Sequence, residues 1–182
     1  MELGKRIRYI RKSQRRTLQE IADACGFTKS LLSKIENGRT MPPVATLIKI
    51  AGTLGVRVSD LLDEGGRAET VLTESAAVQN HFIQTNKGYS FYTFAPNYKG
   101  KAMQPFLFTA RKDQIKEHVL SHEGHEFVYM LEGEMKYKVG QIEYTLRAGD
   151  SLYFDSLEEH AVIPITDEVK YLAVIAESTS SE

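Results

Sequence analysis

Residues 121–134 read SHEGHEFVYMLEGE, and the rest of the chain is organised around this stretch. It holds two of the five histidines, then the carboxylate of Glu126, then an apolar run that stops at a glycine. In an unbroken strand His122 and Glu126 would lie about 13 Å apart, because each residue advances the chain by roughly 3.3 Å. The two side chains can therefore share a ligand only if the chain turns between them, and Gly124 permits such a turn.

A third candidate ligand is His160, which lies on a later β-rich segment. Two imidazoles and one carboxylate leave coordination positions open and suit zinc, iron, manganese or nickel without selecting among them. We therefore expect one divalent metal ion at His122, Glu126 and His160. Two alternatives stay open: a metal-free pocket in which the same groups hydrogen-bond a small molecule, and histidines with a purely structural role.

The sequence around this stretch, residues 87–182, consists of short β-rich segments separated by turn residues. Such a series over about a hundred residues favours an antiparallel closed barrel or double sheet. The predicted strands are 89–95, 102–110, 126–131, 135–139, 142–146, 151–154, 161–165 and 169–176.

Two motifs in this region resemble those of the cupin family. The spacing of His122, Glu126 and Gly133 resembles the first cupin motif, and residues 146–155, LRAGDSLYFD, followed by His160 resemble the second. The resemblance implies an all-β jelly-roll barrel.

The cupin resemblance covers residues 118–165 and includes one departure. The usual first histidine of the family falls at Leu120, which cannot ligate a metal. The wall of a cupin pocket should be apolar and aromatic, with few polar groups. By strand placement the candidates for a small-molecule effector pocket are Tyr89, Tyr92, Phe106, Phe108, Val128, Tyr129 and Phe154. These side chains suit an ordinary core equally well.

Charge divides the chain into two parts. Residues 1–64 carry 12 Lys and Arg against 7 Asp and Glu, whereas residues 65–182 carry 11 against 17 and hold all five histidines. This asymmetry indicates a basic part suited to a polyanion and an acidic part that is not. The single cysteine, Cys25, excludes an intrachain disulfide. Because a secretory signal and a membrane-length apolar run are also lacking, we expect a cytoplasmic protein with no membrane partner.

The basic part contains several short helical patterns. Leu3, Ile7 and Ile10 repeat at helical spacing, with basic residues that include Arg11 around the remaining surface. A second helix begins at Thr17 with a capping box and ends at a glycine. Further apolar repeats bring the total to five helices.

A third helix is expected to begin at Thr28 or Ser30, only a few residues after the second ends at Gly26. Two short helices joined across a glycine turn, inside a bundle of about sixty residues, describe a helix-turn-helix module. Residues 17–22, TLQEIA, and 26–38, GFTKSLLSKIENG, resemble the lambda-repressor/Cro class of DNA-binding domains.

That resemblance covers residues 3–62 and implies that the third helix reads DNA. The side chains expected to face base edges are Thr28, Lys29, Ser30, Ser33 and Lys34. The resemblance places Gln19 at an adjacent phosphate or base contact, and Asn37 and Arg39 at the backbone. A single such domain reads a short half-site, so we expect a homodimer on a two-fold double-stranded operator.

Between the two parts, residues 63–70 lack apolar periodicity and contain a glycine pair, which is typical of a linker. Residues 71–84 are expected to form a first strand. The predicted organisation is α+β with two domains: residues 1–64 as an all-α helix-turn-helix domain, 65–86 as linker and first strand, and 87–182 as an all-β cupin.

A cupin behind a repressor-like domain resembles a group of bacterial transcriptional regulators. The resemblance implies that an effector in the cupin changes operator binding. The alternative is a mononuclear-iron cupin oxygenase similar to hydroxypropylphosphonate epoxidase, which also has a repressor-like head and binds iron through two His and one Glu. The polar third helix and the basic head favour the regulator over the enzyme.

Overall fold

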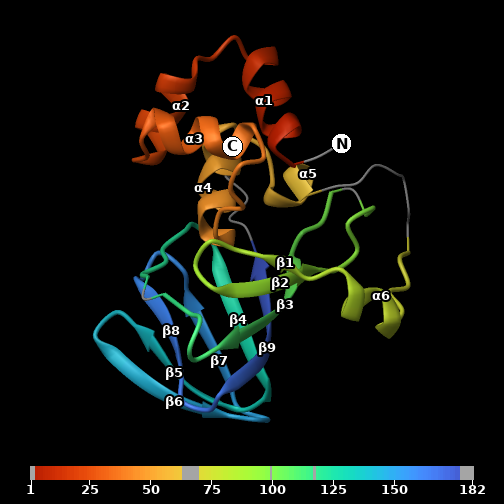
Figure 1. Cartoon of the computed structure of the whole chain (residues 1–182), viewed down its shortest axis with the longest axis vertical. Helices are drawn as coiled ribbons and strands as arrows, with labels where there is room; N and C mark the ends of the chain where they lie inside the picture. Colours follow the sequence, from red (N-terminus) through yellow and green to blue (C-terminus); the bar gives the residue numbers. More distant parts are fainter. Residues whose placement is uncertain (1–2, 63–69, 99, 117, 177–182) are drawn as a thin grey trace. The chain divides into compact units, whose positions relative to one another are not determined.

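The computed structural model describes residues 3–62, 70–98, 100–116 and 118–176. The chain divides into two compact units, one built from five helices and one that contains the strands (Figure 1). The first unit runs from Met1 to Val71 and includes Pro96–Gly100, and the second comprises Leu72–Ala95 and Lys101–Glu182. No helix within the described ranges has both the length and the apolar character needed to cross a bilayer.

The helices of the first unit are α1 (Leu3–Ser13), α2 (Leu18–Cys25), α3 (Lys29–Glu36), α4 (Val44–Thr53) and α5 (Val58–Leu62). Local signals fix where α2 and α3 begin and end. Thr17 and Glu20 form a reciprocal capping box at the start of α2. Gly26, with a left-handed φ of 69°, ends α2. Thr28 Oγ1 then accepts a hydrogen bond from the N–H of Leu31 and begins α3.

Each of the five helices contributes a fully buried aliphatic side chain. These are Ile7, Ile21, Leu32, Leu47 and Leu61, each 0% exposed. Burial of one such side chain stabilises the fold by about 1.5–3 kcal/mol. Because helices this short are marginal in isolation, the shared core, more than helix propensity, holds α3 in position.

The expected strand at residues 71–84 is wrong for most of its length. Ser75–Asn80 form helix α6, and only Ile83–Gln84 (β1) pair with a strand. Alanine is the best helix former, and two alanines lie in this helix, where Asn80 Nδ2 also donates to the carbonyl of Ala76 at 3.0 Å. Residues 63–69 of the predicted linker lie outside the described residues.

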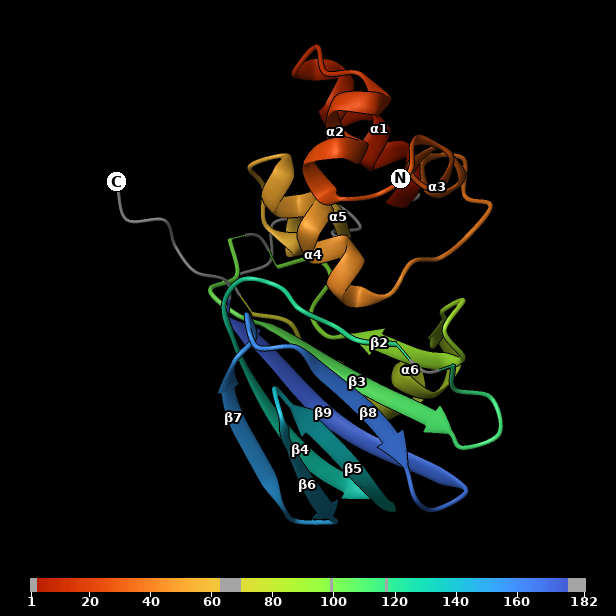
Figure 2. The ribbon, with the colours of Figure 1, turned by 90° about the vertical axis from the view of Figure 1, so that its left-hand side faces the viewer.

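The remaining strands are β2 (Tyr89–Thr93), β3 (Gln104–Arg111), β4 (His125–Glu132), β5 (Glu134–Val139), β6 (Ile142–Arg147), β7 (Ser151–Asp155), β8 (His160–Pro164) and β9 (Glu168–Ala176). They form one sheet of order β1-β2-β3-β9-β4-β7 and a second of order β6-β5-β8, with antiparallel pairing throughout. Figure 2 shows β9, the last strand in sequence, lying between β3 and β4. The α+β prediction of a helical domain followed by antiparallel cupin-like sheets is confirmed.

Alternation along β4 decides which side chains enter the interior of the second unit. Glu126, Val128 and Met130 are buried, whereas Phe127 and Tyr129 on the other face are more than one-third exposed. Successive side chains of a strand point to opposite faces. Glu126 is therefore a carboxylate in an otherwise apolar row, and it needs polar partners there.

Candidate functional site

Three ionisable side chains meet in the interior of the second unit. The Nε2 atom of His122 lies 3.3 Å from Glu126 Oε2, and the Nε2 atom of His160 lies 3.6 Å from the same oxygen. His122 is 4% exposed, Glu126 5% and His160 1%. One potential ligand atom from each lies within 4.8 Å of the others, so the group could hold a metal ion.

Turns and strand pairing bring these residues together. Gly124, with φ of 102°, lies in the turn that separates His122 from strand β4. The backbone of Ser156 holds both sides of this turn, accepting from the N–H of His122 and donating to the carbonyl of Gly124, each at 2.9 Å. His160, the first residue of β8, exchanges two backbone hydrogen bonds with Leu120. The residue at the position of the usual first cupin histidine thus helps to place a candidate ligand although it cannot ligate.

The contacts made by Nδ1 of the two imidazoles define which ring nitrogen carries the hydrogen. His122 Nδ1 lies 3.1 Å from the carbonyl oxygen of Glu123, and His160 Nδ1 lies 2.9 Å from that of Glu158. A carbonyl oxygen only accepts, so each Nδ1 must carry the hydrogen. In a neutral ring, Nε2 then presents a lone pair toward Glu126, as in metal-ligating histidines.

Burial shifts the pKa of two side chains at this site, His160 and Tyr137. It lowers the pKa of His160, although the charge of Glu126 opposes the shift. Burial also raises the pKa of Tyr137 well above its usual range, so the phenol keeps its hydrogen. Its hydroxyl donates to Glu126 Oε1 at 3.1 Å, which leaves Oε2 facing the imidazoles. Phe154 and Tyr137 also lie against the His160 ring, with centroids 5.0 and 6.3 Å away.

The donor set fits a divalent cation. Two Nε2 lone pairs and a carboxylate oxygen converge, and among the described residues Nε2 of His160 has no hydrogen-bond partner. Ligand atoms about 2.1 Å from one ion lie roughly 3.0–3.4 Å apart at octahedral or tetrahedral angles. The observed separations of 3.3 and 3.6 Å are close to that range.

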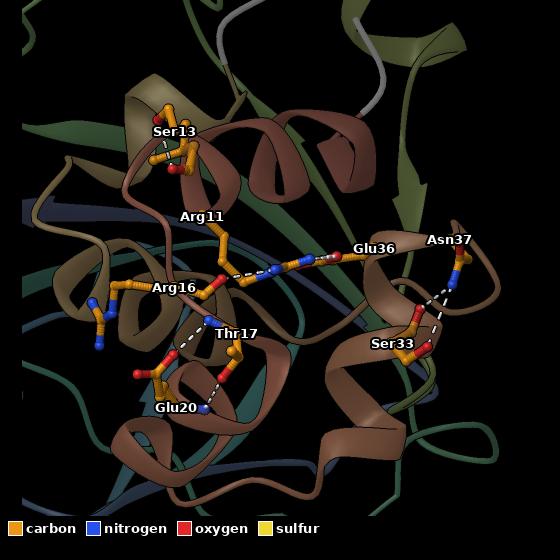
Figure 3. A network of polar contacts seen from close by, with 9 residues as sticks. Arg11, Ser13, Arg16, Thr17, Glu20, Ser33, Glu36 and Asn37 are labelled. Carbon is orange, nitrogen blue, oxygen red and sulfur yellow. Dashed lines mark hydrogen bonds and ion pairs between the residues drawn. The ribbon is translucent and has the colours of Figure 1, made fainter.

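In the first unit, α3 presents a polar face opposite its buried face. Leu32, Ile35 and Glu36 are buried. The residues predicted to contact DNA are all exposed except half-buried Ser33; they are Gln19, Thr28, Lys29, Ser30, Ser33, Lys34, Asn37 and Arg39. Asn37 Nδ2 donates to the carbonyl of Ser33 at 2.8 Å, which completes the last turn of α3 (Figure 3).

A buried ion pair attaches α3 to α1. Nε and Nη2 of Arg11 donate to the two carboxylate oxygens of Glu36 at 2.6 and 2.8 Å, and Nη1 donates to the carbonyl of Arg16 at 2.9 Å (Figure 3). The expectation that Arg11 lies on the surface is therefore wrong, because it shares the inward face of α1 with Gly4 and Ile7. Hydrogen bonding to Glu36 is the main cause that raises the pKa of Arg11.

Comparison with known proteins assigns both units to families. A helix-turn-helix family model matches residues 7–61, and a cupin-domain model matches residues 106–175. PuuR, an HTH-type transcriptional regulator of Escherichia coli strain K12, is 25% identical over 149 residues, which cover 81% of this chain and 80% of PuuR. The chain therefore combines a helix-turn-helix domain with a cupin domain, the organisation of a transcriptional regulator of this kind.

Other similarities support parts of this regulator. The immunity repressor protein of Bacillus phage phi105 is 36% identical over 80 residues, but the match spans only 53% of that repressor. The solved structure of an HTH_3 family transcriptional regulator from Vibrio cholerae covers 97% of this chain and 96% of its own, with a TM-score of 0.72 and 21% identity. The match to the Fe(II) form of hydroxypropylphosphonic acid epoxidase covers 95% of this chain and 97% of the epoxidase, with a TM-score of 0.51 and 21% identity. At these identities the two structures show a shared fold.

The predicted effector-pocket residues divide between two faces of the larger sheet. Tyr89, Phe106, Phe108 and Val128 are buried, and Phe154 is half-buried beside His160. Tyr92 lies three positions after Tyr89 on β2, so its side chain points to the opposite face of the sheet. There it contacts Phe82 and Phe94. Tyr129 is likewise on the outward face of β4 and 38% exposed.

Sequence reasoning missed Tyr137, the phenol that contacts Glu126. The signal is present in β5, where Met135 and Tyr137 alternate with Lys136 and Lys138. Alternation predicts that Tyr137 points inward. It does not predict a partner on another sheet.

Proposed function

We propose that the protein binds a two-fold DNA operator as a homodimer through α3, and that an effector and a divalent metal in the cupin domain change this binding. The observation that carries the DNA-binding part is the exposed polar face of α3, whose opposite face is fixed in the core. Lys29 lies at the start of that helix, where recognition helices contact base edges. A lysine there can donate to guanine O6 and N7.

The test of operator reading is Lys29→Ala. We expect affinity for an operator, selected from random duplexes with the wild-type protein, to fall by about 10- to 100-fold, with relaxed preference at one base pair. Fluorescence anisotropy at fixed salt measures this. Lys49→Ala, which removes the same charge from an exposed position on α4, is the control and should change affinity much less. Equal effects of both substitutions would mean that Lys29 acts only as a charge.

The metal part of the proposal rests on the geometry of His122, Glu126 and His160. Protein purified without chelators should contain about one metal ion per chain by elemental analysis, and His160→Ala should remove it. The ion would polarise a bound effector or fix its orientation as a Lewis acid. Stoichiometric metal that persists in both His122→Ala and His160→Ala would place the ion elsewhere.

A mononuclear-iron oxygenase is a second candidate. Two imidazoles and one carboxylate are also the ligand set of non-haem iron oxygenases, in which positions stay open for oxygen and substrate. Oxygen consumption by the Fe(II)-loaded protein with candidate hydroxylated substrates distinguishes the two. Turnover that His160→Ala abolishes would favour the enzyme, whereas operator binding that depends on the cupin ligand favours the regulator.

A further inference from the structure

His118 is a second histidine of the cupin unit that the candidate metal centre does not use. Its ring stacks on Tyr89, with centroids 5.5 Å apart and planes inclined by 13°. Its Nδ1 lies 2.7 Å from the carbonyl oxygen of Lys116. Its Nε2 is buried, and no group among the described residues pairs with it.

These contacts define what His118 can do. Since the carbonyl of Lys116 only accepts, Nδ1 carries the hydrogen and Nε2 presents a lone pair. Burial lowers the pKa of His118, which keeps the ring neutral at physiological pH. A buried acceptor without a partner destabilises the fold, because it has lost its hydrogen bonds to water. A hydrogen-bond donor from a bound molecule would remove that destabilisation.

The backbone on either side fixes the location of His118. The N–H of Lys116 donates to the carbonyl of Lys87 at 2.9 Å, and two residues beyond His118 the chain pairs with His160 through Leu120. The backbone around His118 is therefore attached on one side to the turn before β2 and on the other to a residue of the candidate metal centre. Burial is the largest cause that lowers the pKa of His160, and the charge of a protonated His118 would add slightly to that lowering.

We propose that Nε2 of His118 accepts a hydrogen bond from a hydroxyl or amine group of the effector, whose other end binds at His122, Glu126 and His160. This inference rests on the proposed function and specifies the effector as a small molecule with a metal-binding group at one end and a donor at the other. Aromatic side chains next to His118 suit an apolar spacer, since Tyr89 packs edge-on against Phe108 at 5.6 Å.

The experiment uses full-length protein and matched probes. Straight-chain carboxylic acids are compared with the same acids that carry a terminal hydroxyl or amine, by calorimetric titration and thermal shift, with and without Co²⁺. For the chain length that spans the site, the donor-bearing acid should bind the wild type about tenfold more tightly than its plain partner. His118→Phe, which preserves the stacking, should abolish this preference without changing the affinity of the plain acid.

Two further variants complete the design. His118→Gln retains an acceptor oxygen near the position of Nε2 and should restore at least part of the preference. It also serves if the Phe variant does not fold. His81→Phe is the control, since His81 Nδ1 has the same kind of contact with a carbonyl, that of Ala77 at 2.8 Å, but the residue is exposed. It should behave as the wild type.

The outcomes separate this inference from the metal proposal. The absorption spectrum of added Co²⁺ tests the metal centre separately. If wild-type protein does not change that spectrum, the metal proposal is wrong. The donor preference in the titration without metal then still tests the role of His118. If no probe length shows a preference, or if the preference survives in His118→Phe, the inference is overturned. A loss of Co²⁺ affinity in His118→Phe would make His118 a metal ligand and would also overturn it.

Discussion

The candidate metal site consists of a few polar side chains in the apolar interior of the cupin domain. Glu126 accepts from the hydroxyl of Tyr137 through one oxygen and faces His122 and His160 with the other. Hydrogen bonds behind a metal ligand orient it and tune its basicity. Tyr137 is therefore expected to position Glu126 without contacting the metal itself.

Replacing Tyr137 by Phe tests this role. The variant keeps the ring packing and removes the hydroxyl, so metal affinity should fall by about tenfold or more, within the range measured for such supporting groups. Competition titration against a chelating dye measures the change. Tyr144→Phe, at the register position opposite Tyr137 on β6 and 37% exposed, should leave affinity unchanged. An unchanged affinity in Tyr137→Phe as well would make Tyr137 a packing residue only.

Glu36 is a buried carboxylate of the helical unit, as Glu126 is of the cupin unit. Glu36→Gln would leave the Arg11 guanidinium buried without its counter-charge, and such losses cost about 3–5 kcal/mol. The midpoint of helix unfolding in urea, followed by circular dichroism, should therefore move to a lower urea concentration. Glu143→Gln breaks an ion pair with Lys136 whose side chains are 46% and 44% exposed, and it should cost less than about 1 kcal/mol. Similar small losses in both variants would contradict a stabilising role for the buried pair.

At the level of elements, α1 approaches the end of α3 with almost no room between them. A Cβ atom added at Gly4 would lie 2.4 Å from the carbonyl oxygen of Ile35 and 2.7 Å from that of Glu36. These atoms belong to the backbone of α3 and cannot rotate away. The close contact and the Arg11–Glu36 pair together fix the orientation of the helix that is proposed to read DNA.

Gly4→Ala should therefore destabilise the helical unit by about 1–3 kcal/mol or more, as for other over-packed sites. If part of the strain is relieved by a shift of α3, operator affinity should fall as well. Gly52→Ala is the matched control, because nothing lies within 4 Å of its Cβ position in α4. It should stabilise the unit by up to about 1 kcal/mol through helix propensity. A neutral Gly4→Ala would mean that α1 moves freely relative to α3.

At the scale of the whole molecule, a helix-turn-helix unit and a cupin unit are joined in one chain. For the cupin ligand to regulate the protein, it must bind the DNA-competent and DNA-incompetent forms with different affinity. Coupling of this kind is reciprocal, because both affinities belong to one thermodynamic cycle.

We therefore predict that operator affinity and metal affinity change by the same factor in two separate titrations. If saturating metal alters operator affinity by some factor, saturating operator must alter metal affinity by the same factor. Such couplings are typically about 5- to 150-fold. Anisotropy with labelled operator and dye competition for the metal give the two numbers. Tight metal binding with no effect on operator affinity would leave the ion a structural or catalytic role.

The sequence by itself determined what local rules can specify. Thr17, Gly26 and Thr28 set the helix ends, because caps and left-handed glycines act within a few residues. From β2 to β9 the strand ends were predicted to within two residues, since alternation and turn residues are also local signals. The turn between His122 and Glu126 followed from simple chain geometry, and the distances between their side chains agree with it.

Only the tertiary structure decided which distant groups meet. The pairing of Arg11 with Glu36 depends on helix packing, and the contact of the Tyr137 hydroxyl with Glu126 depends on how strands β4 and β5 pack together. The same is true of His118, whose unpaired Nε2 is apparent only when its neighbours are known. Contacts between residues far apart in sequence arise when the whole core is buried together, and no local pattern contains them.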